Sequence, residues 1–113
     1  MCSDFDVMEV QKAAGLTSAE MTLLISVFEK YPSIEKVVLF GSRSTGKHKP
    51  HSDVDLVIYG EQVNFGTLFD LEDSLYDAGF GLELDILLHS IIQDDRLLRA
   101  IDRTATVVYQ SLV

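Results

Sequence analysis

The strongest constraint on the fold is the alternation, along the chain, of segments with helical periodicity and short apolar runs. Apolar residues spaced at i, i+3, i+4 and i+7 predict helices, while short runs of β-branched and aromatic residues predict strands. We expect helices at about 18–30, 67–79 and 90–103, and strands at 36–40, 54–59, 82–88 and 106–109. This alternation favours a single α/β (α+β) domain over residues 1–113, in which 1–16 form a loosely ordered N-terminal segment.

The composition narrows the classes of function. The 113 residues include 9 Lys and Arg against 18 Asp and Glu, a net charge of −9, which disfavours direct binding to nucleic acid. An anionic substrate would therefore have to arrive with its own metal ion. No apolar run approaches the roughly 18 residues of a membrane span, and the acidic N-terminus does not resemble a secretory signal. A single cysteine, Cys2, excludes an internal disulfide and suits the cytoplasm.

Acidic side chains share one face of two expected strands. Because side chains alternate along a strand, Asp53 and Asp55 lie on the face opposite to Leu56, and Asp85 lies opposite to Leu84. If the two strands are neighbours, the three aspartates meet on one polar face, where they could hold one or two hard cations such as Mg²⁺. A lone acid at a strand edge is usually solvated, but the combination favours a site for phosphoryl or nucleotidyl transfer.

A polar loop follows the first expected strand. Gly41, which lacks a Cβ, would let the backbone approach a phosphate group. Ser42 would add a hydroxyl and an amide N–H, and Arg43 and Lys47 could neutralise phosphate charge or simply be solvated. We assign no role to the histidines or the cysteine, which are His48, His51, His89 and Cys2.

The same loop also matches part of a P-loop. Gly41 to Lys47 fits the first seven positions of the pattern G-x-x-x-x-G-K-[ST], and it follows a strand. His48 then stands where a Ser or Thr should ligate Mg²⁺, and Pro50 falls in the first turn of the expected helix. The P-loop is therefore the weaker interpretation.

Gly41-Ser42, ten further residues and then Asp53-Val-Asp55 resemble the signature of the DNA polymerase β-like nucleotidyltransferase superfamily. The Phe-Gly-Ser-Arg context and the short length resemble its minimal nucleotidyltransferase (MNT) branch. The resemblance implies a mixed β-sheet flanked by helices and transfer of a nucleoside monophosphate from a nucleoside triphosphate to a hydroxyl. It implies that the triphosphate is held by Gly41, Ser42 and Arg43, and two Mg²⁺ ions by Asp53, Asp55 and Asp85.

Resemblance to the MNT branch also implies a partner. MNT proteins pair with all-helical HEPN proteins and act as antitoxins that adenylylate a tyrosine of a HEPN toxin, with ATP as the substrate. We therefore expect either a hetero-oligomer with such a partner or a homodimer. Ser44-Thr45 replaces the Ala-Arg often seen in this branch, which favours, as an alternative, a non-catalytic module that binds nucleotide or covers its partner. Nucleotidylation of a small molecule fits the short chain less well.

Overall fold

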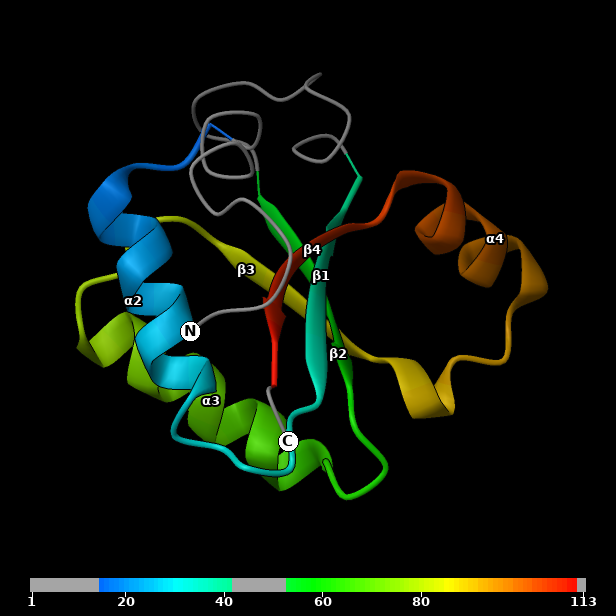
Figure 1. Cartoon of the computed structure of the whole chain (residues 1–113), viewed down its shortest axis with the longest axis horizontal. Helices are drawn as coiled ribbons and strands as arrows, with labels where there is room; N and C mark the ends of the chain where they lie inside the picture. The colour runs from blue at the N-terminus through cyan, green and yellow to red at the C-terminus, as the bar shows by residue number, and fades with distance from the viewer. Residues whose placement is uncertain (1–14, 42–52, 112–113) are drawn as a thin grey trace.

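The computed structural model describes residues 15–41 and 53–111. In chain order its elements are α2 (Ser18–Phe28), β1 (Lys36–Phe40), β2 (Val54–Tyr59), α3 (Phe65–Asp77), β3 (Leu84–Leu88), the short 3₁₀ helix η1 (His89–Ile91), α4 (Asp95–Thr104) and β4 (Thr106–Gln110). The four strands form one mixed sheet, flanked by helices on both sides (Figure 1). The expected fold class is confirmed.

The sheet has the strand order β3-β2-β1-β4. The central strand β1 runs antiparallel to both of its neighbours, so that Lys36 lies opposite Tyr59 of β2 and Gln110 of β4. Strands β2 and β3 are parallel and are joined through α3, because a parallel pair needs a crossover connection. As a result, the beginnings of β2 and β3 lie at the same end of the sheet as the end of β1.

One face of the sheet carries the main hydrophobic core. Helices α2 and α3 both cover this face, as Figure 1 shows. Its fully buried side chains come from both helices and from the central strands: Met21, Leu24, Phe28, Leu39, Leu56, Ile58, Leu71 and Leu75. Burying a side chain of this size stabilises a fold by about 1.5–3 kcal/mol, so this layer fixes the positions of β1 and β2.

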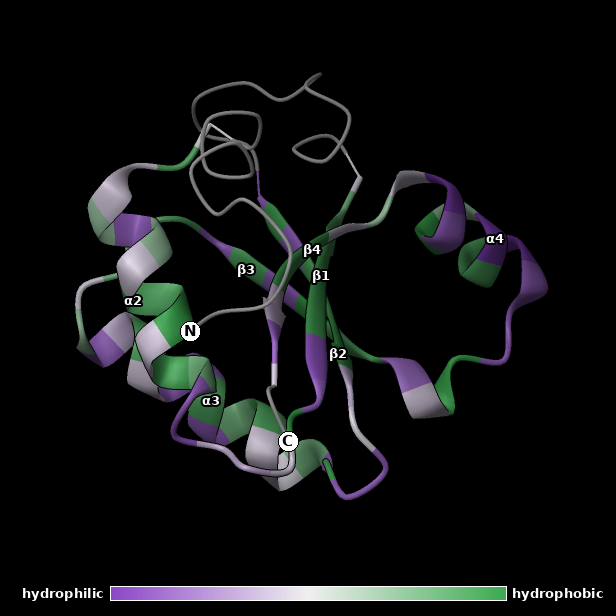
Figure 2. Cartoon of the chain, in the orientation of Figure 1, coloured by the Kyte–Doolittle hydropathy of each residue, from purple (hydrophilic) through white to green (hydrophobic). Residues whose placement is uncertain are grey.

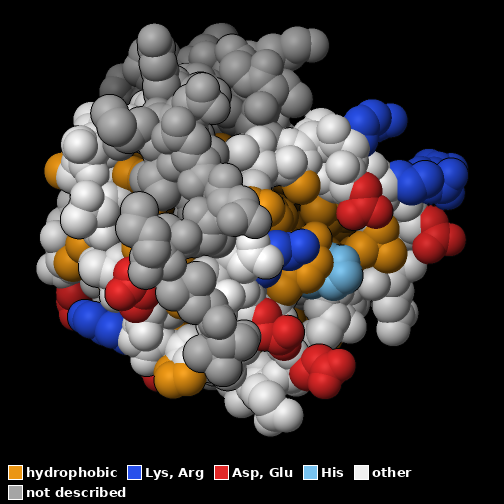
Figure 3. All heavy atoms as spheres, in the orientation of Figure 1, with side chains coloured by type: hydrophobic (Ala, Val, Ile, Leu, Met, Phe, Trp, Pro, Cys, Tyr) orange, Lys and Arg blue, Asp and Glu red, His pale blue; other side chains and the backbone are white. Residues whose placement is uncertain are grey.

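The other face of the sheet is covered more lightly. Ile101 of α4 packs against Val38 and Val57, and the residues around these three are only partly buried. In Figure 2 the strands are mostly hydrophobic, whereas the outward side of α4 is hydrophilic. Figure 3 shows hydrophobic side chains at the surface next to α4. Because Asp55 alternates with the buried Leu56, it belongs to this lightly covered face.

The start of α2 and the end of α3 follow from identifiable capping interactions. The Thr17 side chain accepts a hydrogen bond from the Glu20 backbone, and the Glu20 side chain accepts one from the Thr17 backbone, which confirms the predicted capping box of α2. The α2 helix ends at Phe28 rather than at about residue 30. Gly79 closes α3 as predicted, with a φ of +97°, and the next N–H bonds back to the Leu75 carbonyl.

Three elements begin at a different residue from the one predicted. Helix α3 begins at Phe65 because Asn64, and not Thr67, is its N-cap; the Asn64 side chain accepts from the Thr67 backbone N–H. The last helix begins at Asp95 and not at Ser90, because Asp94 is its N-cap and the extended backbone of Ile92 separates it from η1. Strand β3 begins at Leu84 rather than Leu82.

The N-terminal segment predicted to be loosely ordered, 1–16, lies outside the described residues except for Gly15 and Leu16. Leu16 is only 5% exposed and belongs to the main core. In the part of the chain that is described, no helix is long and apolar enough to cross a membrane.

Candidate active site

The candidate site begins where β1 ends against β2. Phe40, the last residue of β1, pairs with Asp55 of β2, and Gly41 follows with a φ of +78°. A Cβ on Gly41 would lie 2.8 Å from an Oδ atom of Asp55, which is closer than real Cβ atoms approach an oxygen. Gly41 therefore serves two requirements at once: it adopts a left-handed backbone and leaves room for the Asp55 carboxylate.

The second carboxylate comes from the neighbouring strand. Asp85 of β3 is the direct partner of Asp55 in the parallel ladder of β2 and β3, where adjacent strands are about 4.8 Å apart. Both side chains point to the lightly covered face, because the alternate residues Leu56, Leu84 and Ile86 pack into the main core. The prediction that Asp55 and Asp85 meet on one face is confirmed.

Asp53 is the third carboxylate of the group. It lies just before β2 begins and is exposed, and the period of two along an extended chain places it on the same face as Asp55. Its charge reaches Asp55, since the pKa of Asp55 is raised first by burial, then by the negative charge of Asp85 and then by that of Asp53. The negative charges of Asp85 and Asp53 thus both act on the Asp55 carboxylate.

The donor set of this group suits a hard divalent cation. Carboxylate oxygens are the ligands that Mg²⁺ prefers, and a cation would relieve the repulsion that raises the pKa of Asp55. Among residues 15–41 and 53–111, however, no three His, Cys, Asp or Glu side chains are grouped closely enough to hold a metal ion. Asp53 and Asp85 are exposed, so their side chains can turn toward a shared ion. The donor set therefore fits Mg²⁺ in chemistry, and the side chains of Asp53 and Asp85 would have to turn toward Asp55 before the three carboxylates could share one ion.

The other residues singled out in the sequence of the loop and the N-terminus are not among the described residues. Ser42 and Arg43 lie outside the described residues, and so do the residues from Lys47 to His51 and Cys2. The P-loop interpretation does not agree with the sheet, because β1 is antiparallel to both neighbours, whereas a P-loop joins a strand to the helix of a parallel α/β unit.

His89, expected to have no catalytic role, packs against an aromatic ring. Its ring stacks on Tyr59 with centroids 4.1 Å apart, and the Lys36 ammonium lies 4.3 Å from the centroid of the same Tyr59 ring. Burial raises the pKa of the Tyr59 hydroxyl, and the negative charge of Asp102 adds to the effect. Packing against Tyr59 thus accounts for the position of His89 on the lightly covered face.

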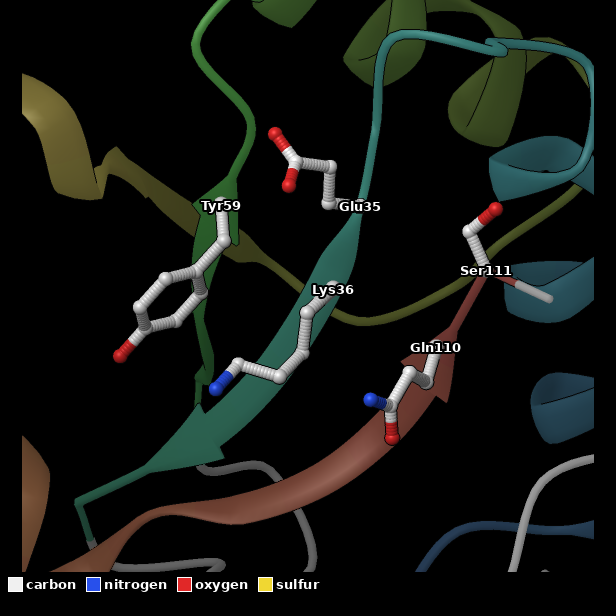
Figure 4. A pocket seen from close by; sticks show the side chains of 5 residues that line it. All are labelled: Glu35, Lys36, Tyr59, Gln110 and Ser111. Carbon is white, nitrogen blue, oxygen red and sulfur yellow. The ribbon is translucent and has the colours of Figure 1, made fainter. Parts of the chain in front are cut away.

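Tyr59 and Lys36 also line an open hollow of about 310 Å³, together with Glu35, Gln110 and Ser111. Figure 4 shows Lys36, Tyr59 and Gln110 projecting to the same side of the sheet. Sequence reasoning singled out none of these residues, because they are brought together only by the ladder that pairs Lys36 with Tyr59 and Gln110. The hollow lies at the end of β1 opposite to Gly41, about 16 Å away along the chain, so it is separate from the carboxylate group.

Comparison with protein families gives one match. The model described as "Polymerase beta, Nucleotidyltransferase" matches residues 23–111, a range that includes Gly41 and the three aspartates. No curated protein matches the chain by sequence.

Solved structures share the fold. A toxin–antitoxin complex crystallised with AMP-PNP has a TM-score of 0.67 at 17% identity, covering 81% of this chain and 74% of that one. The tri-AMPylated HEPN toxin of Shewanella oneidensis in complex with its MNT antitoxin gives 0.61 at 15% identity, covering 82% and 71%. A putative nucleotidyltransferase from Sulfolobus solfataricus gives 0.51 at 18% identity, covering 100% and 99%.

Proposed function

Since the chain belongs to the polymerase β nucleotidyltransferase family, we propose that it transfers AMP from ATP to a hydroxyl group of a protein partner. The observation that carries this proposal is the pairing of Asp55 with Asp85 beside Gly41. Carboxylates from two adjacent strands, next to a turn without a Cβ, are suited to binding a triphosphate together with its divalent cations.

In the proposed reaction, the acceptor oxygen forms a bond to the α-phosphorus of ATP while the bond from that phosphorus to the bridging oxygen breaks, and pyrophosphate leaves. Asp53, Asp55 and Asp85 would hold Mg²⁺, which supplies charge neutralisation and polarises the reacting oxygens when bound. Gly41, with Ser42 and Arg43 after it, would hold the triphosphate. Asp85, which is exposed, would also accept the proton of the acceptor hydroxyl.

The proposed partner is a HEPN-type helical protein. In one solved structure of the same fold, an MNT antitoxin is in complex with a tri-AMPylated HEPN toxin, and in another a toxin–antitoxin complex is crystallised with AMP-PNP. We propose by analogy that this chain is an antitoxin that adenylylates a tyrosine of such a toxin in the cytoplasm, where ATP is present. Fold similarity is the support for this step, and the acidic chain, with a net charge of −9, agrees with a protein acceptor better than with a nucleic acid.

A non-catalytic module is the second candidate. The observation that favours it is that no three ligand side chains in the described part of the chain are grouped for metal binding. Such a module would bind its partner and cover it without transferring a nucleotide.

One experiment separates the two candidates. The purified protein is incubated with α-labelled ATP, Mg²⁺ and the product of the adjacent gene, with Asp53→Asn as the inactive control and Asp95→Asn, at the start of α4, as the second control. We expect label on the partner with the wild type and Asp95→Asn, and none with Asp53→Asn or with EDTA. A tight complex that never becomes labelled would contradict transfer and favour the module.

A further inference from the structure

Helix α3 exposes a row of aromatic side chains. Phe65 is 55% exposed, Phe69 is 68% exposed and Tyr76 is 41% exposed. At 100° per residue, positions 65, 69 and 76 fall within about 40° of one another on the helix, well away from the buried residues Leu71 and Leu75. Single exposed hydrophobic residues are common, but three exposed aromatic side chains on one helix face, with the half-buried Glu72 between Phe69 and Tyr76, indicate a surface for interaction.

The row lies along the edge of the sheet and leads toward the candidate active site. The Tyr76 hydroxyl accepts a hydrogen bond of 2.9 Å from the backbone N–H of Leu84, the residue immediately before Asp85. Strand β3, to which Leu84 belongs, is an edge strand of the sheet. A protein seated on the aromatic row would therefore also border the edge strand that carries Asp85.

Charge identifies the kind of protein that fits. Helix α3 has no Lys or Arg, and it carries four acidic residues, namely Asp70, Glu72, Asp73 and Asp77. Three of them are exposed, and Asp73 and Asp77 adjoin the aromatic row on its outer side. A second copy of this chain would bring the same negative charge against it, and like charges facing one another across an interface are unfavourable.

We propose that the aromatic row of α3, formed by Phe65, Phe69 and Tyr76, is the docking surface for a partner protein whose apolar contact area is surrounded by Lys and Arg. The aromatic rings provide the buried centre of the interface and the carboxylates of α3 provide its rim. The inference rests on the proposed function for the identity of the partner, which is the acceptor protein. It adds where that protein docks and what its surface must carry.

The test measures binding rather than transfer. The product of the adjacent gene is titrated into the wild type and into Phe69→Ser, with Ile91→Ser as a matched control, because Ile91 is 51% exposed on η1. We expect Phe69→Ser to raise Kd at least tenfold, and Ile91→Ser to change it less than twofold. An unchanged melting temperature verifies that Phe69→Ser is folded.

Charge reversal tests the rim. Asp73→Lys combined with Asp77→Lys should raise Kd several-fold at low salt, and the difference from the wild type should shrink as salt screens the charges. Asp102→Lys on α4 is the control and should have no such effect. If these variants bind like the wild type, or if Phe69→Ser does, or if the wild type does not bind at all, the inference is wrong.

Two further readouts separate this inference from its alternatives. Asp53→Asn should bind the partner as the wild type does. If the wild type binds through the aromatic row but transfers no label, the proposed function is refuted and the docking surface stays in place. Sedimentation of the protein alone tests whether a second copy of this chain, rather than a basic partner, binds to the aromatic row. A wild-type dimer that Phe69→Ser converts to a monomer would overturn the choice of a basic partner.

Discussion

Replacing Gly41 by alanine isolates the contact on which the candidate site depends. The new Cβ would lie 2.8 Å from the Asp55 Oδ atom and 3.7 Å from Asp55 Cγ. The nearest neighbour is thus the end of a side chain, so the chain can accommodate the methyl group by moving the carboxylate. The expected damage is therefore to the site more than to the fold.

Two effects set the losses of stability and of transfer activity expected for Gly41→Ala. A Cβ in the left-handed region, where Gly41 has a φ of +78°, costs about 1–2 kcal/mol, or about 4–8 °C in melting temperature for a domain of this size. Moving a metal-binding carboxylate by about 1 Å costs about 100-fold in rate. Gly41→Ala should therefore lose a modest part of its stability and nearly all of its transfer activity.

Gly79 provides the matched control. It also has a positive φ, of +97°, but a Cβ there would meet nothing within 4 Å. Gly79→Ala should lose a similar amount of stability, because the backbone strain is the same, and should keep its transfer activity. The assays are thermal unfolding and transfer of label from α-labelled ATP.

Equal transfer by Gly41→Ala and Gly79→Ala would refute this reasoning. It would mean that the Asp55 carboxylate tolerates displacement or that it has no part in the reaction. A much larger loss of stability in Gly41→Ala than in Gly79→Ala would instead show that the contact supports the fold.

Further predictions concern charge, catalysis and the core. Asp55→Asn in EDTA should be more stable than the wild type at pH 7 by up to about 1 kcal/mol, because it removes a repelled charge on a partly exposed group. The pKa of Asp55 is raised above its ordinary value of 3.8 in the folded protein, so the stability of the wild type falls as the pH rises above 3.8. The extra stability of Asp55→Asn should therefore disappear below about pH 3.8. A stability difference that stays constant with pH would contradict the cause given for the raised pKa. Asp85→Asn should reduce transfer at least 100-fold, whereas Glu83→Gln, two residues earlier and outside β3, should retain at least half. Equal losses in the two variants would remove Asp85 from the site. Phe28→Ala should lower the free energy of unfolding by about 3–5 kcal/mol, since Phe28 is 0% exposed, and a loss below 1 kcal/mol in denaturant unfolding would show that the core tolerates a cavity there.

Much of the fold follows from local patterns. The strands Lys36–Phe40 and Val54–Tyr59 agree with their predicted bounds, because runs of β-branched and aromatic residues between turn residues leave little choice of structure. Their alternation also placed Asp55 on the face opposite to Leu56. The aspartate face was predictable because a period of two assigns a face to each residue once the strand is known.

Other features depend on competition between neighbouring residues or on distant parts of the chain. Thr67 fits a capping pattern, but Asn64 caps α3 one turn earlier. Similarly, Ser90 lies in η1 while Asp94 caps α4. The sequence predicted that Asp55 and Asp85 meet only if their strands are neighbours. That these strands pair in parallel depends on how α3, which connects them, packs against the sheet. The aromatic row of α3 was not foreseen, since exposure is a property of the folded chain.

Direct measurement of metal binding tests the central claim best. Mn²⁺ can replace Mg²⁺, and its free concentration can be followed by electron paramagnetic resonance without nucleotide, because a triphosphate would bind Mn²⁺ itself. If the aspartates of β2 and β3 hold the divalent cation, the wild type should remove free Mn²⁺ from solution, and the variant carrying both Asp53→Asn and Asp55→Asn should not. Equal binding of Mn²⁺ by the wild type and by that variant, with both folded, would contradict the account.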